Sequence, residues 1–405
     1  MSAPSEKNDN NDVVILAATR TPQGRLNGQL AGFTAVELGA HAISGALAAS
    51  GVTADKVDAV IMGQVLQAGA GQNPARQSAI AAGVGWNIPA VTINKVCLSG
   101  LTAVIDAARM IRSGDATVVV AGGQESMSRA PHLLPGSRQG WSYGAIQALD
   151  VAAHDGLTDA FDGQSMGLAT EIKNLSLGID RHSQDEVAAA SHQRAAAAAE
   201  QGVFDGEIAP ISVKQRKGEP KILDSDEGIR PQTTLETLAP LRSAFATDGT
   251  ITAGNSSPLS DGAAALVLTS RRFAEENGLD YLAVIGKPGQ VAGPDNSLHS
   301  QPSNAIRRAL ERAGWTTSDL DFIEINEAFG SVAVQSLKDL DYPLEKCNIH
   351  GGAIAIGHPI GASGARLALH AAHELKRRGK GKAAVGLCGG GGQGEALLLY
   401  RDEER

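Results

Sequence analysis

The segment Asn94-Lys-Val-Cys-Leu-Ser-Gly100 leads into a helical pattern and then into the apolar run Val118-Val-Val-Ala-Gly-Gly123. A second segment, Gly361-Ala-Ser-Gly364, leads in the same way into a helical pattern and then into Ala384-Val-Gly-Leu-Cys-Gly-Gly390. This internal repeat predicts two similar α/β halves that form a pseudo-twofold pair. Equivalent loops of the halves would then face one shared site, because ligands of α/β proteins bind where strands end.

Outward from these segments, short apolar strands alternate with helical patterns. In the first half we expect strands at 13–17, 57–62, 90–94 and 118–121 and helices at 34–49 and 101–111. After residue 260 we expect strands at 263–268, 322–325 and 383–387 and helices at 304–313 and 364–377. This alternation predicts an α/β fold with a largely parallel sheet that helices cover on both faces.

The middle of the chain, from about 126 to 257, lacks this alternation. Ser183 followed by Glu186 is a capping-box signature, which predicts a helix through Ala199 that ends at Gly202. The rest indicates loops, which often carry binding contacts. The predicted division is therefore 1–126 with 258–280 for the N-terminal half, 127–257 for an inserted loop domain, and 281–405 for the C-terminal half.

Length, charge and cysteine content narrow the class of protein. A chain of 405 residues exceeds the size of one hydrophobic core, and its formal charge of −9 offers no basic footprint for nucleic acid. Its three cysteines, Cys97, Cys347 and Cys388, are too few and odd in number for a disulfide framework, which predicts a reducing compartment. No apolar run is long enough for a signal peptide or a membrane span, so we expect a cytoplasmic protein.

Cys97 lies between a predicted strand and the start of a predicted helix. Unpaired N–H groups and the positive end of a helix stabilise a thiolate, so we expect the pKa of this cysteine to fall below its usual value of about 8.5. The position also suits a small buried apolar residue. The strand-to-helix elbow favours the nucleophile.

His358 and Cys388 both lie in glycine-rich segments. His358 belongs to the stretch 351–364, where glycines allow close approach to a ligand, and a histidine held there can act as a base or a hydrogen-bond donor. Cys388 precedes four consecutive glycines, whose N–H groups could point into a cavity as an oxyanion hole. The alternatives are a packed or capping histidine and a flexible turn.

Asn326 opens the motif Asn326-Glu-Ala-Phe329 at the end of a predicted strand. Its amide could hold a water or polarise a carbonyl, and Glu327 could instead be the acting group. A simple helix cap is equally compatible with this motif.

Together, the patterns around Cys97, Asn326, His358 and Cys388 resemble those of the thiolase family. The resemblance covers nearly the whole chain and includes Arg20-Thr-Pro22, Gly122-Gly-Gln-Glu-Ser-Met-Ser128, Gly254-Asn-Ser-Ser257 and Ser260-Asp-Gly-Ala-Ala264. It implies the thiolase fold, in which two similar α/β halves, with mixed, mostly parallel five-stranded sheets between helices, form an αβαβα layering.

The resemblance also implies a role for each site residue. Cys97 would be the acylated nucleophile, activated by His358, and Cys388 would remove the α-proton of a second acyl-CoA. Asn326 would orient a water that, with His358, binds one thioester oxygen. The backbone N–H groups of Cys97 and Gly390 would form a second oxyanion hole, for the acyl-enzyme carbonyl.

The implied reaction is a ping-pong condensation of two acetyl-CoA to acetoacetyl-CoA and CoA, together with its reverse, thiolysis. CoA thioesters would be substrates, with no permanently bound cofactor and no metal. The resemblance further implies a homo-oligomer, as a tetramer built from a dimer of dimers, without nucleic-acid or membrane partners.

Family resemblance places CoA on the inserted segment. Ser257 would lie near the pantetheine arm and Arg230 near the adenine end, while Met166 would line the acyl pocket and Phe329 would contact substrate. One departure concerns Ser165, because many short-chain members carry histidine at this position. This departure weakens the inference that acetyl is the only acyl group accepted.

Other functions compete with this interpretation. A broader-range 3-ketoacyl-CoA thiolase of fatty-acid β-oxidation would share every catalytic residue. A condensing enzyme that works on acyl carrier protein normally lacks the second cysteine, so Cys388 argues against it. A non-catalytic thiolase-like CoA-binding protein should have lost a catalytic side chain. A zinc site is disfavoured, because Cys97, His358 and Cys388 form no metal-binding pair in sequence.

Overall fold

Apolar runs rich in Val, Ile and Ala form the strands of the central sheet. The computed structural model describes residues 12–215 and 217–403. The first half contributes strands in the order β4 (Ala90–Ile93), β3 (Ala59–Gly63), β5 (Val118–Ser126), β10 (Ser260–Ser270) and β1 (Val13–Arg20). The second half contributes β11 (Ala283–Ala292), β14 (Gln393–Arg401), β13 (Gly381–Gly389) and β12 (Phe322–Ile325), in that order. Every strand predicted above is present.

The sheet is mixed, and the direction of each pair follows from its connection. β3 is parallel to β4 and β5, and β12 is parallel to β13, where a helix separates the strands along the chain. The central pairs β1–β10, β5–β10, β11–β14 and β13–β14 are antiparallel. Antiparallel pairing is more extensive than the alternation of elements indicated. A tight turn such as the one between β13 and β14 can only return the chain antiparallel.

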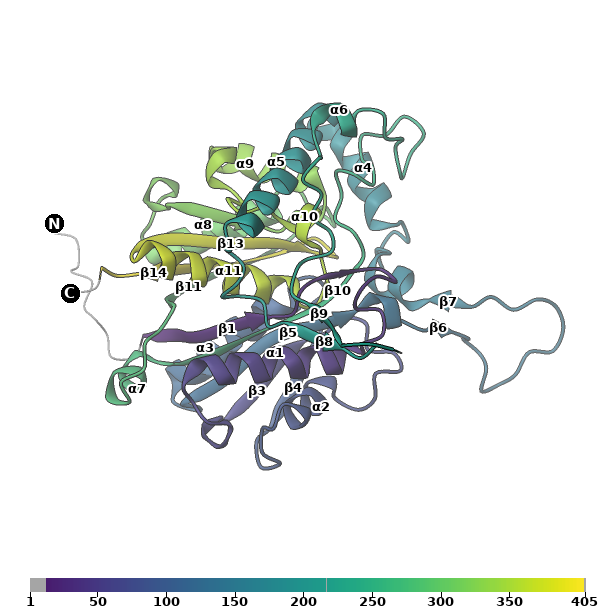
Figure 1. Cartoon of the computed structure of the whole chain (residues 1–405). Helices are drawn as coiled ribbons and strands as arrows, with labels where there is room; N and C mark the ends of the chain where they lie inside the picture. The colour runs from purple at the N-terminus through teal and green to yellow at the C-terminus, as the bar shows by residue number, and fades with distance from the viewer. Residues whose placement is uncertain (1–11, 216, 404–405) are drawn as a thin grey trace.

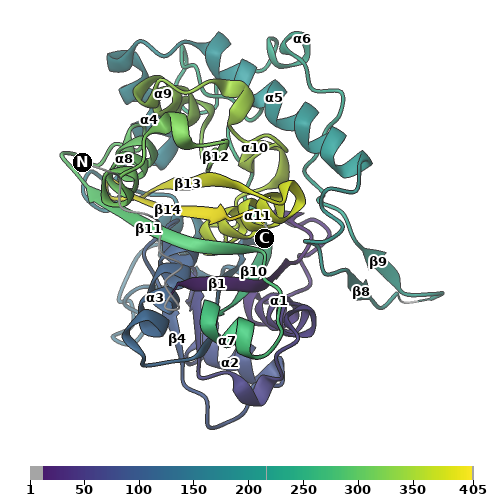
Figure 2. The same ribbon diagram turned by 90° about the vertical axis from the view of Figure 1, so that its left-hand side faces the viewer.

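The two halves differ at one edge of the sheet. Among the described residues the second half has four strands rather than the five expected, and an isolated parallel bridge between Ile323 and Cys347 lies beside β12 in place of a further strand. The halves are joined where Val13, Val14 and Ile15 of β1 pair with β11 (Figure 2).

Helices and sheet alternate in the predicted αβαβα layering (Figure 1). The outer helices are α1 (Ala35–Ser50) and α2 (Pro74–Ala81) on one side, and α8 (Gln301–Ala313) and α9 (Gly330–Leu340) on the other. The central helices are α3 (Ser99–Ser113) and α11 (Ser363–Arg378), which follow the two repeat segments. Leu101 and Ile105 of α3 share one buried core with Leu367 and Leu375 of α11. The two copies of the repeat thus place the starts of α3 and α11 in contact with each other in the middle of the molecule.

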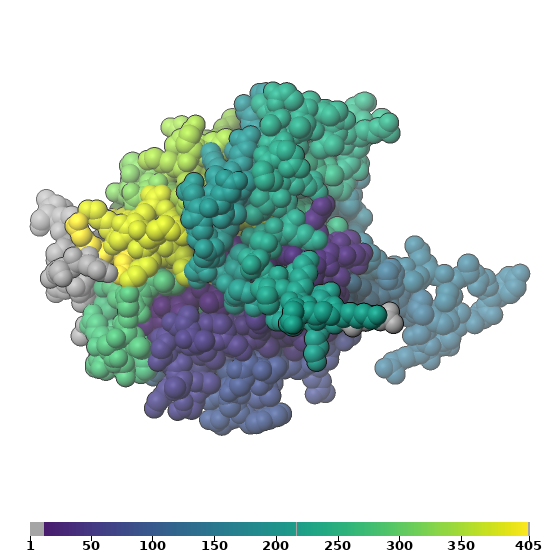
Figure 3. All heavy atoms as spheres, in the orientation of Figure 1, coloured from purple at the N-terminus to yellow at the C-terminus, as the bar shows by residue number. Residues whose placement is uncertain are grey.

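The middle of the chain consists of loops with short elements. It contains β6 (His132–Leu133), β7 (Leu149–Asp150), α4 (Met166–Leu177), α5 (Arg181–Glu200), β8 (Ile211–Val213), β9 (Lys221–Leu223) and α6 (Leu235–Leu238). The segment between β6 and β7 projects away from the body of the molecule (Figure 3). The division at residues 126, 258 and 281 stays a prediction, although β10 returns to pair with β1 and β5 of the first half.

The predicted start of α5 is wrong by a few residues. Asp180, rather than Ser183, is the capping residue, and its side chain accepts a hydrogen bond of 2.8 Å from the Ser183 backbone N–H. Both residue types can cap a helix, but the helix begins at Arg181, so Asp180 is the residue whose side chain reaches the free N–H groups of the first turn. No helix within the described part of the chain is both long and apolar enough to cross a membrane.

Candidate active site

Cys97 lies on a strained elbow between β4 and α3. The preceding residue, Val96, has φ of +50°, in the left-handed region that a β-branched residue rarely occupies. The Asn94 side chain accepts from the Val96 N–H at 3.0 Å, and the Ser99 hydroxyl donates to the Val96 carbonyl at 2.6 Å. The Lys95 N–H in turn donates to Ser99 Oγ at 2.8 Å. These hydrogen bonds hold the turn in a conformation that the chain would not adopt alone.

His358 lies in the loop between α10 (Ala353–Ile356) and α11. Its Nδ1 is 2.5 Å from Ser363 Oγ, and the Ser363 hydroxyl donates to the Pro359 carbonyl at 2.9 Å. The Ser363 hydroxyl proton is directed at Pro359, so it cannot also be donated to His358. The proton between His358 Nδ1 and Ser363 Oγ therefore belongs to Nδ1, which donates to the serine oxygen. The Nε2 atom is therefore the acceptor, and it lies 3.4 Å from the Asn326 amide nitrogen. The loop thus presents a neutral imidazole whose lone pair is on Nε2.

Cys388 lies near the end of β13, just before the glycine turn into β14. Gly391 and Gly392 have φ of +75° and +66°, so this turn requires glycine and the run is a tight turn rather than a flexible linker. The Gly390 N–H acts to lower the pKa of the Cys97 thiol, and Gly390 packs against the side chain of Val96 on the elbow. The turn therefore carries one sulfur and aims a backbone donor at the other.

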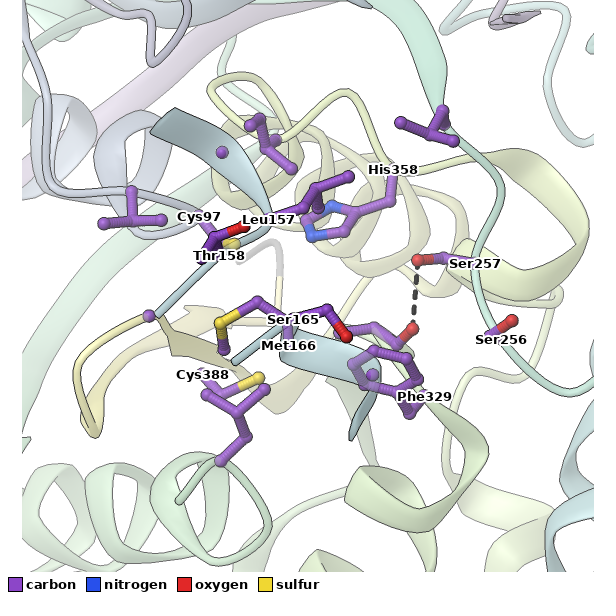
Figure 4. Close-up of a pocket in the computed structure, with 18 of the residues that line it drawn as sticks. Cys97, Leu157, Thr158, Ser165, Met166, Ser256, Ser257, Phe329, His358 and Cys388 are labelled. Carbon is purple, nitrogen blue, oxygen red and sulfur yellow. Dashed lines mark hydrogen bonds between the residues drawn. The ribbon is translucent and has the colours of Figure 1, made fainter. Parts of the chain in front are cut away.

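A single cavity of about 330 Å³ collects these groups (Figure 4). Its lining includes Cys97, His358, Cys388, Gly390, Ser257, Met166 and Phe329. The elbow, the His358 loop and the glycine turn are distant in sequence and meet at this cavity. The internal repeat predicted such a shared site.

Two of the predicted site residues do not line this cavity. Asn326 is fully buried behind His358 and contacts its ring. Arg230 lies apart from the cavity. Its backbone N–H donates a hydrogen bond to His192 Nδ1 at 3.2 Å, and its guanidinium interacts with the charge of Arg25. Asn326 can therefore act through His358, whereas Arg230 could only meet the far end of a long ligand.

Burial dominates the electrostatics of the sulfurs. It raises the pKa of Cys97 to about 12, while the N–H groups of Gly390 and of Cys97 itself act in the opposite direction. The expectation of a lowered pKa for Cys97 is thus wrong, because loss of solvent outweighs the donors. Burial also raises the pKa of Cys388, and the nearby Cys97 raises it further.

The pKa of the imidazole shifts in the direction opposite to the pKa values of the thiols. Burial, and then the charge of Arg366, lowers the pKa of His358 to about 3. At neutral pH the site therefore holds two neutral thiols and one neutral imidazole. A neutral imidazole next to a thiol is the state that can accept its proton.

One buried acidic group beside the site does not stand out in the sequence. The fully buried Glu125 accepts hydrogen bonds from the N–H groups of Val65, Leu66 and Gly361, at 3.0, 3.1 and 3.0 Å. Burial raises its pKa to about 7. The signal in the sequence that could identify Glu125 is its place in the segment 122–128, which is one of the motifs that carry the family resemblance.

Ser165 has a local role that the sequence left open. Its hydroxyl accepts from the Leu168 N–H at 3.2 Å and caps α4, and the residue also lines the cavity. Leu157 and Thr158 of the preceding turn complete this wall (Figure 4). One wall of the cavity is thus built by the start of α4 together with the turn that precedes it.

The comparisons with known proteins agree with this geometry. Residues 13–272 match the family model "Thiolase, N-terminal domain", and residues 279–401 match "Thiolase, C-terminal domain". The chain is 56% identical to a probable acetyl-CoA acetyltransferase of Mycolicibacterium smegmatis, over 96% of this chain and 100% of that protein. It is 51% identical to an acetyl-CoA acetyltransferase of Pseudomonas aeruginosa, over 96% of this chain and 100% of that protein.

A solved structure supports the same assignment. The crystal structure of the Bacillus anthracis acetyl-CoA acetyltransferase superposes with a TM-score of 0.93 at 40% identity, and covers 96% of this chain and 98% of that one. The two family models together span nearly all of the sequence, and the solved structure shares the fold. The chain belongs to the thiolase family.

Proposed function

We propose that the protein is an acetyl-CoA C-acetyltransferase that joins two acetyl-CoA into acetoacetyl-CoA and also catalyses the reverse thiolysis. The observation that carries the proposal is the meeting of Cys97, Cys388 and His358 at one cavity. Relatives named acetyl-CoA acetyltransferase, similar over their full length, support the choice of substrate.

In the first half-reaction Cys97 attacks the thioester carbonyl. His358 Nε2 takes the thiol proton as the sulfur–carbon bond forms. The tetrahedral intermediate then expels the CoA thiolate, which takes a proton from Cys388. The products are acetyl-Cys97, free CoA, a protonated His358 and a Cys388 thiolate, so protons and charges balance.

In the second half-reaction the Cys388 thiolate removes an α-proton from a second acetyl-CoA. The resulting enolate attacks the acetyl carbonyl on Cys97, and a carbon–carbon bond forms. The Cys97 thiolate leaves and recovers its proton from His358. The raised pKa of Cys388 suits this role, because a basic thiolate is needed for a weak carbon acid.

Two sets of donors would stabilise the oxyanions. The N–H groups of Cys97 and Gly390 serve the acyl-enzyme carbonyl, and one such donor contributes about 3–4 kcal/mol. Asn326 and His358 serve the thioester of the second substrate, with a water held by Asn326. The buried Asn326 Oδ1 finds no hydrogen-bond partner among the described residues, which is consistent with a bound water.

CoA would enter along the inserted segment. The Ser257 hydroxyl donates to the Ala328 carbonyl at 3.0 Å, beside Phe329, and Ser257 lines the cavity (Figure 4). This position supports a contact with the pantetheine arm. Met166 would limit the acyl group, and Arg230 would meet the nucleotide end. No permanently bound cofactor is needed for these steps.

Assembly and location extend the proposal. Large apolar side chains are exposed on the segment between β6 and β7, where Trp141 is 47% and Tyr143 102% exposed. Exposed apolar groups on a projecting segment suit contact between copies of the chain, which supports a homotetramer. Three free cysteines support a reducing cytoplasm.

Mass spectrometry after brief exposure to acetyl-CoA tests the covalent step. We expect one acetyl group on Cys97, no label in Cys97→Ser, and normal labelling in the matched control Cys347→Ala, since Cys347 is buried in the core around α8 and does not line the cavity. Labelling elsewhere, or none, would overturn the proposal and favour a CoA-binding protein without catalysis.

Substrate range separates this activity from a broader 3-ketoacyl-CoA thiolase. We expect thiolysis of acetoacetyl-CoA to exceed that of longer 3-ketoacyl-CoA, because the bulky side chains of Met166 and Phe329 line the cavity and would limit the length of the acyl chain. Equal rates across chain lengths would select the broader enzyme.

A further inference from the structure

An ion pair outside the catalytic cavity joins the two halves directly behind the elbow. Lys95 Nζ lies 3.0 Å from Glu395 Oε1, and the Glu395 side chain is fully buried. The Thr102 hydroxyl donates to Glu395 Oε2 at 2.5 Å, and the Gln290 amide donates to Oε1. Each carboxylate oxygen therefore has a partner, and Lys95 brings the compensating charge.

The two partners stand next to the groups that make the site. Lys95 precedes Val96 and Cys97 on the elbow. Glu395 follows Gly394, which pairs with Cys388 across the β13–β14 hairpin. The ion pair therefore links the segment that carries the first sulfur to the hairpin that carries the second.

Elbow and hairpin are also in direct contact. A β-carbon on Gly389 would lie 2.7 Å from the Leu98 side chain, and one on Gly390 would lie 3.3 Å from that of Val96. Such closeness leaves little tolerance for a shift of either segment. The glycine turn has no side chains of its own. It accepts a backbone hydrogen bond at the Gly392 carbonyl from the Gly293 N–H, at 2.8 Å, and Glu395 adds a side-chain anchor just beyond it.

We propose that Lys95 and Glu395 are positioning residues that hold the Gly390 N–H against the Cys97 sulfur. The catalytic consequence rests on the proposed function, because the same N–H would stabilise the acetyl-Cys97 carbonyl. Neither side chain lines the cavity, so both act through the elbow and the hairpin.

Loss of the pair should withdraw the Gly390 N–H from the sulfur. The Cys97 thiolate then loses a donor, and its pKa rises further. One unit of pKa lowers the thiolate fraction about tenfold at any pH well below the pKa, and alkylation slows in proportion. The acetyl-enzyme carbonyl loses the same donor, so kcat for condensation should fall by about 10- to 100-fold, with little change in KM.

The experiment compares Lys95→Met and Glu395→Val with the wild-type full-length protein. Iodoacetamide labelling of Cys97 is followed by mass spectrometry between pH 7 and 9. We expect about tenfold slower labelling of both variants at each pH. Lys95→Arg should restore the rate, because it keeps a cation opposite the carboxylate. If a variant fails to fold, Glu395→Gln, which keeps the shape of the side chain, takes its place.

Arg271→Met is the matched control. Arg271 pairs with Asp12 and Asp402 just beyond Ser270, at the end of β10 remote from His358, which contacts Ser260. Unchanged labelling rates and kcat in the Lys95 and Glu395 variants, with a lowered melting temperature like that of Arg271→Met, would show a purely structural pair and overturn the proposal. Labelling needs no acetyl-CoA, so failure of wild-type acetylation would sink the proposed function and leave this comparison valid.

Discussion

His358 Nδ1 and Ser363 Oγ lie 2.5 Å apart, and the Ser363 hydroxyl is already committed to the Pro359 carbonyl. The serine therefore selects the tautomer of the histidine. Ser363 lies at the start of α11, in the second copy of the internal repeat. One helix start thus orients the base of the site, while its counterpart, α3, follows the nucleophile.

Ser363→Ala should slow acetylation of Cys97. Without the Ser363 oxygen as acceptor, the tautomer that carries the proton on Nδ1 is no longer favoured. A smaller fraction of the protein then presents a lone pair at His358 Nε2. We expect a fall of about 10²-fold, at the low end of what a general base contributes. Rapid-quench mass spectrometry of the acetyl-enzyme measures the rate. Ser336→Ala is the control, because Ser336 is buried and donates to the His299 carbonyl in the same manner; an equal fall in that variant would refute the tautomer argument.

The buried neutral His358 should make the protein sensitive to acid. Its pKa is about 3 in the folded state and near 6.5 when unfolded, so between these values the unfolded chain binds the additional proton. The stability linked to this group is complete above pH 6.5 and is lost as pH falls toward 3. Between pH 7 and 5 the wild type should lose about 2 kcal/mol more free energy of unfolding than His358→Gln. Urea titrations of both proteins at the two pH values measure the difference, and parallel losses would contradict it.

Cys388→Ala should separate the two half-reactions. Cys97 and His358 stay in place, so acetylation should still occur, with the departing CoA thiolate taking its proton from solvent instead of Cys388, whereas α-proton removal loses its base. Condensation should fall by about 10²- to 10⁴-fold. Acetoacetyl-CoA formation and acetyl-Cys97 are measured on the same sample, with Cys347→Ala as the variant expected to keep both. A Cys388→Ala protein that cannot be acetylated would show that the roles of the two sulfurs are assigned wrongly.

Arg230→Ala should affect binding and leave chemistry intact. Arg230 lies away from the cavity, near Arg25, and could meet only the distant phosphates or adenine of CoA. We expect KM for acetyl-CoA to rise about tenfold with kcat unchanged, the pattern of a contact made equally in ground and transition states. Steady-state kinetics measure both constants. Arg308→Ala, an exposed cation on α8, serves as the control, and a lower kcat in Arg230→Ala would place the residue nearer the reacting atoms.

Much of the fold was predictable from the sequence, because strands, helices and turns depend on neighbouring residues. The runs at 118–121 and 322–325 were recognised by their apolar patterns alone. The glycines after Cys388 predicted N–H groups that point into a cavity, with a flexible turn as the alternative. The structure has a tight turn, since only glycine readily accepts the φ of Gly391 and Gly392. The start of α5 differs from the prediction because Asp180 and Ser183 are both residue types that cap helices, and the local pattern does not choose between them.

The sequence by itself determined which residues could carry the chemistry: Cys97, His358 and Cys388 were found from their motifs. Only the tertiary structure decided how they behave. The pKa of Cys97 rises because distant segments remove its solvent. The anchoring of Lys95 by Glu395 depends on residues that come together only when the two halves pack. Motifs follow from covalent neighbours, whereas burial and charge depend on which remote parts of the chain meet.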